Sequence, residues 1–164
     1  MVITMTEKIK IRNATVDDSK RISEILEQIA ALHSENRPDI FSGAKGKYNA
    51  GELKKILKNP DKPVLVAVDG EGEILGYAFC VLCVNKKTTL GRERKILYVD
   101  DLCVDKAFRG RGVGTLLMDR CVELAREHGC NNVELNVWGF NKKALAFYEN
   151  YGMSEQRRCM EITL

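Results

Sequence analysis

The chain has 164 residues, a mass of 18.5 kDa and a formal net charge of +3 at pH 7. This length suits one domain with its own hydrophobic core, so we expect a single domain over residues 1–164. The composition, 45% hydrophobic and 30% charged, is ordinary for a soluble protein, and no apolar run approaches the roughly 18 residues of a membrane helix.

The amino-terminal segment and the cysteines both favour a reducing compartment. Residues 1–15 lack the long apolar core of a secretory signal, so we expect a cytoplasmic location. The six cysteines lie mostly inside apolar segments, which predicts buried thiols rather than disulfides. Cys80 and Cys83 have metal-ligand spacing, but on a strand they would point to opposite faces and no second pair exists, so we expect no metal.

The first third of the chain predicts a strand, two helices and a long loop. Alternation over residues 8–15 is typical of a strand, and a capping box at Thr15 begins a helix over 17–35. Residues 35–48 contain proline and glycines and predict a loop, which is a candidate lip of a substrate site. A short helix follows at 51–59.

Residues 63–105 predict three strands and no helix. Residues 63–84 form two apolar runs joined by the turn sequence DGEG, which predicts a β-hairpin. The polar residues 85–94 are expected to be a mobile connection. A fourth strand is expected over 95–105.

The last third of the chain alternates between helices and strands. A long helix is expected over 111–129, ended by a glycine, then a strand over 131–138, a helix over 141–152 and a last strand over 157–164. Because antiparallel hairpins precede strand-helix-strand units, the sequence predicts an α+β fold with a mixed sheet and helices packed on it.

The segment KAFRGRGVGTLLMDR joins the fourth strand to the long helix. A helix N-terminus presents unpaired N–H groups and the positive end of the helix dipole, which favour an anion. Gly110, Gly112 and Gly114 leave the backbone open to a phosphate, and Arg109 and Arg111 add positive charge. The pattern indicates a cradle for a pyrophosphate.

Other interpretations of this segment are a glycine-rich turn with solvated arginines, or an RNA contact of the RGG type. Disordered RGG tracts, however, do not join an apolar strand to an amphipathic helix. The segment also lacks the Lys-Ser/Thr ending of a P-loop, and its glycines have the wrong spacing for a dinucleotide fingerprint. The spread-out net charge does not by itself indicate nucleic acid.

Three separated motifs resemble the GNAT superfamily of N-acetyltransferases. They are the Arg-x-x-Gly-x-Gly pattern at 109–114, the upstream YVDDLCVDKAF and the downstream VELNVWGFNKKALAFYENYGM, so the resemblance covers residues 95–153. It implies a mostly antiparallel, twisted sheet that is flanked by helices and splayed between its fourth and fifth strands. It also implies acetyl-CoA as the co-substrate.

The resemblance assigns cofactor contacts to the main chain of the fourth strand and to the cradle. In the family the cradle holds the pyrophosphate of coenzyme A, the pantetheine arm lies along the fourth strand, and an asparagine contacts that arm. The corresponding residues are Leu102, Cys103, Val104, Arg109, Gly110, Arg111, Gly112, Val113, Gly114 and Asn141.

Two residues are candidates for proton transfer. Tyr148 matches a family tyrosine near the leaving sulfur, and a positioned phenol can protonate a thiolate. A primary amine must lose a proton before it attacks, and the fourth strand is similar to that of the spermidine/diamine acetyltransferases, in which Asp100 corresponds to the proposed base. We expect Asp100 and its neighbour Asp101 to face opposite sides of the strand. Cys103 is not expected to be a nucleophile, since no base pairs with it.

The resemblance implies direct transfer of acetyl to a primary amine, and the acceptor is expected to be a small amino-compound or a polyamine. Glu24, Glu27 and His33 on the first helix are candidates for the acceptor pocket. A protein or peptide amine is the alternative, and a non-catalytic module that binds CoA or RNA is a third reading. We expect no nucleic-acid or membrane partner, and a homodimer stays open.

Overall fold

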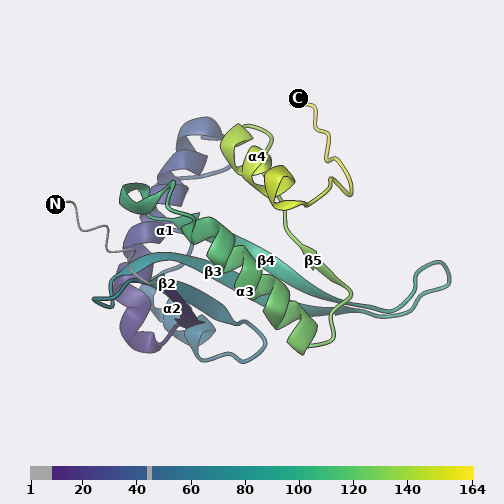
Figure 1. Cartoon of the computed structure of the whole chain (residues 1–164). Helices are drawn as coiled ribbons and strands as arrows, with labels where there is room; N and C mark the ends of the chain where they lie inside the picture. Colours follow the sequence, from purple (N-terminus) through teal and green to yellow (C-terminus); the bar gives the residue numbers. More distant parts are fainter. Residues whose placement is uncertain (1–8, 44–45) are drawn as a thin grey trace.

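The computed structural model describes residues 9–43 and 46–164, and its elements follow the predicted order up to the last helix (Figure 1). The first residue of the strand expected over 8–15 and two residues of the expected lip lie outside this part. The strands are β1 (Lys10–Asn13), β2 (Val64–Val68), β3 (Ile74–Asn85), β4 (Arg94–Val104) and β5 (Asn132–Glu134). The helices are α1 (Ser19–Asn36), α2 (Ala50–Leu57), α3 (Val113–Glu127) and α4 (Lys142–Tyr151).

The strands form one sheet in the order β1-β2-β3-β4-β5. Neighbours from β1 to β4 pair antiparallel, whereas β4 and β5 pair in parallel. The predicted hairpin is the β2–β3 pair, and β3 and β4 continue beyond the body of the sheet as a long hairpin arm (Figure 1). The α+β class with a mostly antiparallel sheet is therefore confirmed.

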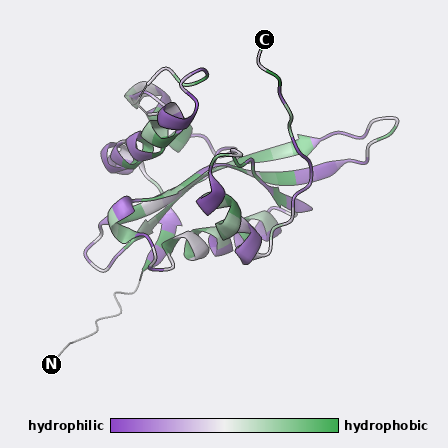
Figure 2. Cartoon of the chain, turned by 90° about the horizontal axis from the view of Figure 1, so that it is seen from above, coloured by the Kyte–Doolittle hydropathy of each residue, from purple (hydrophilic) through white to green (hydrophobic). Residues whose placement is uncertain are grey.

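Helices cover both faces of the sheet, each over its own hydrophobic core. On one face α3 buries Leu117 and Cys121 against β3 and β4, and on the other α1 buries its apolar stripe, including Ile22 and Ile25. The central strand segments are mostly hydrophobic in Figure 2, as expected for strands covered on both sides. Burial of each such side chain contributes about 1.5–3 kcal/mol.

The predicted splay lies between β4 and β5. The two strands pair only where Ile96–Tyr98 meets Asn132–Glu134, although β4 continues to Val104. The fifth strand is shorter than the expected 131–138, because the strands diverge after Glu134 and leave the rest of it without a ladder partner. The divergence opens a gap along one edge of β4.

The prediction of a last strand over residues 157–164 is wrong. These residues form no strand, and Met160, Ile162 and Leu164 are 80%, 84% and 113% exposed. Their alternation with polar residues suits a strand, but the chain brings no partner strand beside them. The segment runs to a free end away from the body in both views (Figures 1 and 2).

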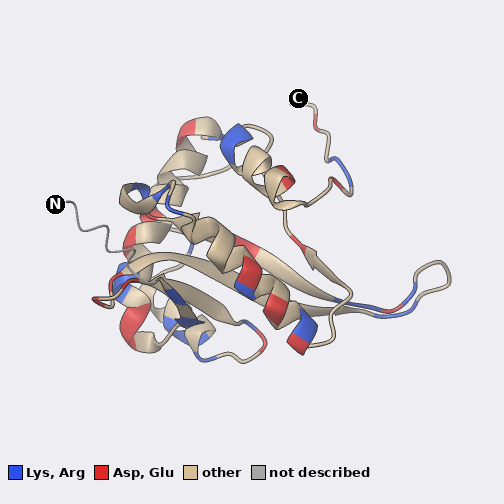
Figure 3. Ribbon diagram, viewed as in Figure 1, with Lys and Arg blue, Asp and Glu red and all other residues tan. Residues whose placement is uncertain are grey.

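The surface of α3 carries charges of both signs along its outer side (Figure 3). Arg120 pairs with Glu127 at 2.8 Å and with Glu123 at 3.5 Å. None of the helices in the described part of the chain combines the length and apolarity needed to cross a membrane. All six cysteines are free thiols, and they are buried at Cys80, Cys103 and Cys121, half-buried at Cys83 and Cys130 and exposed at Cys159.

Candidate active site

The cradle predicted from the glycines lies at the start of α3. Gly110 and Gly112 have φ angles of +78° and +79°, and Gly112 is the N-cap residue of the helix. Such left-handed positions favour glycine, and no atom lies within 4 Å of the place where a Cβ would stand on either residue. Within the described residues, the N–H groups of 110–115 have no protein acceptor. The cradle is thus open and lined with free donors, which fits a pyrophosphate.

Three other cradle residues play different parts. The side chain of Val113 is buried in the core, so only its main chain faces the cradle. A Cβ on Gly114 would stand 3.2 Å from the Phe147 ring, so this glycine serves the packing of α4 on α3. Arg109 donates from Nε to the Val104 carbonyl at 3.0 Å, which holds its guanidinium beside the end of β4.

The gap between β4 and β5 exposes main-chain groups of alternate β4 residues. The N–H of Asp105 donates to the Leu75 carbonyl, so Asp105 and, by alternation, Cys103 direct their main-chain groups toward β3. Leu102 and Val104 therefore direct theirs to the β5 side, where β5 does not pair with them and the Val104 carbonyl accepts from Arg109 Nε at 3.0 Å. The Cys103 thiol is buried with the α1 side of the core, so neither its side chain nor its main chain faces the gap.

Asp100 occupies a β-bulge at the point where the gap begins. The register pairs Phe79 with Asp101 and Cys80 with Val99, which leaves Asp100 without a partner on β3. Its carboxylate accepts from Lys47 Nζ at 2.6 Å and from the Tyr48 hydroxyl at 2.7 Å. Burial alone would raise the pKa of Asp100, but these two hydrogen bonds outweigh it and the net shift is downward.

The bulge also overturns the expectation that Asp100 and Asp101 face opposite sides. Asp101 pairs with Phe79 on the α1 face, and Asp100 contacts Tyr48 on that same face, because the extra residue resets the alternation. Burial, together with the charge of Asp100, raises the pKa of Asp101 to about 6, although Lys47 acts in the opposite direction. Two adjacent carboxyl groups therefore have pKa values that are shifted apart.

Tyr77 and Tyr148 keep their protons at neutral pH. Burial, followed by the charge of Asp101, raises the pKa values of Tyr77 and Tyr148 well above the usual range. The Tyr77 hydroxyl is buried without a hydrogen-bond partner in the described part of the chain. Tyr148 lies on α4 with its ring against Phe147 at 5.1 Å and is partly exposed, so its phenol is a proton donor that a ligand can reach.

Asn141 is the N-cap residue of α4, and its Oδ1 accepts from the Ala144 N–H at 3.1 Å. The capping bond uses the oxygen of the side-chain amide and leaves the Nδ2 donors for another partner. Sequence reasoning assigned Asn141 only a cofactor contact. The structure adds a role in starting the helix that carries Tyr148.

An aromatic cluster stands between the end of α1 and the β5–α4 loop. His33 stacks on Phe41 at 5.0 Å, Phe41 meets Trp138 edge-on at 5.4 Å, and Trp138 stacks on Phe140 at 6.1 Å. Burial and the charge of Lys47 lower the pKa of His33. We call His33, Phe41, Trp138 and Phe140 the aromatic wall.

Sequence reasoning found this side of the site only in outline. The candidate lip at 35–48 supplies Phe41, Lys47 and Tyr48, and a pocket of about 220 Å³ beside it is lined by Lys47, Tyr48 and Asp100. Of the three acceptor candidates on α1, the structure brings His33 to the aromatic wall, whereas Glu24 pairs with Arg21 at 3.2 Å and Glu27 is exposed. Sequence reasoning did not identify the other rings of the aromatic wall. The sequence held one indication of them, the aromatic residues of WGF at 138–140.

The chain is similar to several N-acetyltransferases. Residues 26–153 match the sequence model of the acetyltransferase (GNAT) family. An uncharacterised N-acetyltransferase of Methanocaldococcus jannaschii is 28% identical over 155 residues, which are 94% of this chain and 65% of that protein. A glucosamine 6-phosphate N-acetyltransferase of Trypanosoma brucei brucei is 37% identical over 94 residues, 57% of this chain and 59% of that protein. The chain thus spans about 60% of the length of these two curated relatives.

A solved structure is similar over nearly its whole length. The tetramutant of the BH1408 protein from Bacillus halodurans superposes with a TM-score of 0.91 and 32% identity, covering 94% of this chain and 99% of that one. The glycine cradle, the splayed strands and the matched residues therefore lead to one assignment: the chain belongs to the acetyltransferase (GNAT) family, whose co-substrate is acetyl-CoA.

Proposed function

We propose that this chain transfers an acetyl group from acetyl-CoA directly to the primary amine of a small, positively charged amino-compound. The observation that carries the proposal is the Lys47 ammonium group, which Asp100 holds at 2.6 Å in the bulge where the β4–β5 gap opens. A primary alkylammonium is the group that an amine acceptor would present at this place. Lys47 therefore marks a position where such a group is stabilised.

The surroundings of Lys47 suit a cationic acceptor in two further ways. Its Nζ lies 5.5 Å from the centre of the Tyr48 ring. Aromatic faces attract ammonium groups, and two adjacent carboxyl groups add negative charge. A diamine, a polyamine or an amino acid with a second amine has the chemistry that this combination recognises.

Cofactor binding would use the cradle and the gap. The free N–H groups of 110–115 and the side chains of Arg109 and Arg111 would hold the pyrophosphate of acetyl-CoA. The pantetheine arm would follow the main-chain groups of Leu102 and Val104 into the gap, with Asn141 donating from Nδ2. Bound acetyl-CoA supplies the thioester as the acetyl donor.

Proton transfer would use the carboxyl groups and Tyr148. The acceptor ammonium must lose its proton before attack, and we propose that Asp100 takes it, with Asp101 next to it. The acetyl carbon then bonds to the amine nitrogen and its bond to sulfur breaks. Tyr148, which is protonated at neutral pH, gives its proton to the departing thiolate, and the second proton that the acetylated nitrogen loses restores the Tyr148 phenol.

An amine panel tests this function. Purified protein is incubated with acetyl-CoA and a set of polyamines, diamines, amino acids with a second amine, amino sugars and lysine-containing peptides. Release of free thiol and the mass of the product are measured together. We expect the highest kcat/KM for a small amine with a second positive charge. Acetylation of peptides alone would refute the acceptor class, and no thiol release with any amine would refute the proposed activity.

A further inference from the structure

Asp105, the residue that follows β4, is one of two charged residues that are buried in the described part of the chain, and it is 5% exposed. Its Oδ2 accepts from Arg21 Nη2 at 2.8 Å and from Gln28 Nε2 at 3.1 Å. Its Oδ1 accepts from the Ala107 N–H at 2.8 Å. Burial alone would raise the pKa of Asp105, but these hydrogen bonds outweigh it and the net shift is downward. The carboxylate is therefore charged at neutral pH and fully paired.

Both side-chain donors to Asp105 come from α1, so this carboxylate joins α1 to the end of β4. The Gln28 amide makes a second contact there, because its Oε1 accepts from the Lys106 N–H at 3.0 Å. Arg21 is held in turn by Glu73, whose carboxylate lies 2.8 Å from its Nε. The contact between α1 and the residues before the cradle is therefore polar and directional.

Asp105 also fixes the 3₁₀ turn Lys106–Phe108, which leads into the cradle. Its side chain accepts from the Ala107 N–H, and its carbonyl accepts from the Phe108 N–H at 2.9 Å. The Arg111 guanidinium lies 5.3 Å from the centre of the Phe108 ring. The turn therefore determines where one of the two cradle arginines lies.

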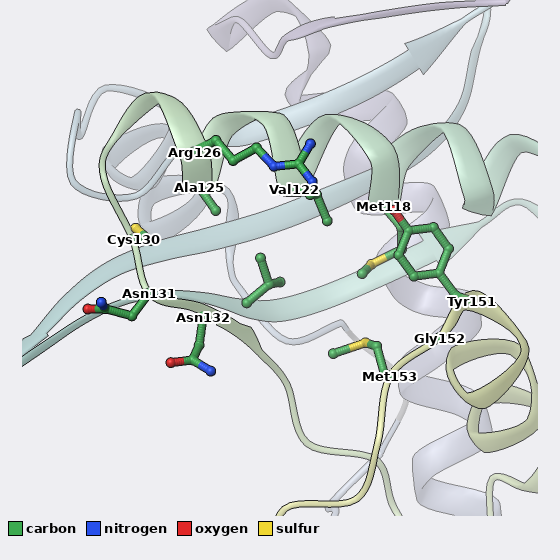
Figure 4. A pocket seen from close by; sticks show the side chains of 11 residues that line it. Met118, Val122, Ala125, Arg126, Cys130, Asn131, Asn132, Tyr151, Gly152 and Met153 are labelled. Atoms are coloured by element: carbon green, nitrogen blue, oxygen red, sulfur yellow. The ribbon is translucent and has the colours of Figure 1, made fainter.

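The helix α3 carries the second half of the cradle, and the hydrophobic core holds this helix through Leu117 and Cys121. A groove of about 380 Å³ lies between α3, β5 and the end of α4, and its first lining residue on α3 is Met118 (Figure 4). Residues 109–112 precede the helix and do not line this groove. We therefore expect their position to depend on the turn before them.

We propose that Asp105 is a positioning residue for acetyl-CoA. Held by Arg21 and Gln28, it fixes the turn that places the N–H groups and arginines of 109–114 around the pyrophosphate. The carboxylate faces α1 and the Ala107 N–H, so it acts through the cradle and does not contact the cofactor. The proposal rests on the proposed use of the cradle for pyrophosphate, and it is independent of the identity of the acetyl acceptor.

Two isosteric substitutions separate positioning from folding. Asp105→Asn removes the charge that Arg21 and Gln28 hold. Asp18→Asn is the matched control, because Asp18 is the other buried aspartate and accepts from Arg12 at 2.7 and 2.9 Å at the start of α1. Both variants should have a lower Tm than the unmodified chain. Only Asp105→Asn should bind acetyl-CoA more weakly, by about 10-fold in calorimetry.

Gln28→Met tests the same contact from the side of α1. Methionine keeps the length of the side chain and removes the hydrogen bonds to Asp105 and to the Lys106 N–H. This variant should also bind acetyl-CoA more weakly than the unmodified chain, and it tests the proposal even if Asp105→Asn does not fold. The double variant should bind as weakly as Asp105→Asn alone, because the two residues act through one contact.

A truncated substrate shows whether the pyrophosphate is the part that is affected. S-acetylpantetheine carries the thioester but lacks the pyrophosphate. With the best amine of the panel, Asp105→Asn should lose about 10-fold in kcat/KM for acetyl-CoA, through KM, and should match the unmodified chain with S-acetylpantetheine. A general structural defect would lower both values.

Three results would overturn the positioning role: unchanged acetyl-CoA affinity in the folded Asp105 and Gln28 variants, an equal loss of affinity in Asp18→Asn, or an equal loss of kcat/KM with S-acetylpantetheine. An unmodified chain that binds coenzyme A no more tightly than pantetheine would refute the proposed use of the cradle, and the positioning role with it.

Discussion

The surroundings of Asp100 and Asp101, two adjacent residues on β4, shift their pKa values in opposite directions. Hydrogen bonds from Lys47 and Tyr48 keep Asp100 ionised, whereas burial raises the pKa of Asp101 to about 6. Neighbouring acids with pKa values shifted apart are typical of catalytic sites. We therefore propose Asp101 as a second candidate for proton transfer near neutral pH.

Asp101→Asn should stabilise the protein, and the gain should depend on pH. A raised pKa means that the folded state binds the proton more tightly than the unfolded state, so the carboxylate costs stability above pH 6. We expect the variant to gain about 1–3 kcal/mol in the free energy of unfolding above pH 7. The gain should shrink as the pH falls through 6 and vanish below about 4. Urea unfolding from pH 4 to 8 measures it, and a gain that is constant with pH would contradict the burial of this carboxyl.

Tyr148→Phe should separate turnover from binding. The substitution removes one oxygen and keeps the ring on Phe147, so acetyl-CoA affinity should stay unchanged while kcat falls by about 10²-fold, the low end for a lost general acid, because CoA thiolate is a fair leaving group. Steady-state kinetics with the best amine and calorimetry with acetyl-CoA give the two values. Unchanged kcat would make Tyr148 a packing residue, and a parallel loss of affinity would make it a cofactor contact.

At the scale of elements, the start of α3 was the most predictable part of the site. Positive φ angles, free N–H groups and arginines are local properties, so a short sequence pattern specifies them. The bulge at Asp100 was not predictable in this way, because it depends on the register between β3 and β4. For the same reason the sequence could name both aspartates but assigned their directions wrongly.

A matched pair at Gly112 tests the cradle. Asparagine and aspartate have nearly the same shape and both meet the same unfavourable φ of +79°, so their difference reports the charge alone. Gly112→Asp should bind acetyl-CoA at least about 10-fold more weakly than Gly112→Asn, because a carboxylate repels the pyrophosphate. Calorimetry on both folded variants measures this. Equal affinities would show that no anion binds next to residue 112. Gly114→Val is a poorer test, since its side chain would meet Phe147.

At the scale of the whole molecule, the order of strands and helices along the chain followed from the sequence, whereas the fate of the last predicted strand did not. Hydrophobic periodicity identified the strands of the sheet, and the GNAT resemblance implied where it opens. The periodicity of residues 157–164 is equally strong, yet these residues are in solvent. Periodicity indicates that a segment suits a strand with one buried face, but it does not show whether the fold brings a partner strand beside it.

The exposed main-chain edge of β4 has a consequence for how this chain can change. The cofactor half of the proposed site consists largely of backbone groups, whose positions depend on the path of the chain rather than on side-chain identity. The acceptor half consists of side chains, those of Asp100 and Asp101 on β4 and of His33 on α1 together with those on two loop regions, 37–43 with 46–48, and 135–140. A few substitutions in those loops can therefore change which amine the enzyme acetylates, while its binding of acetyl-CoA stays the same.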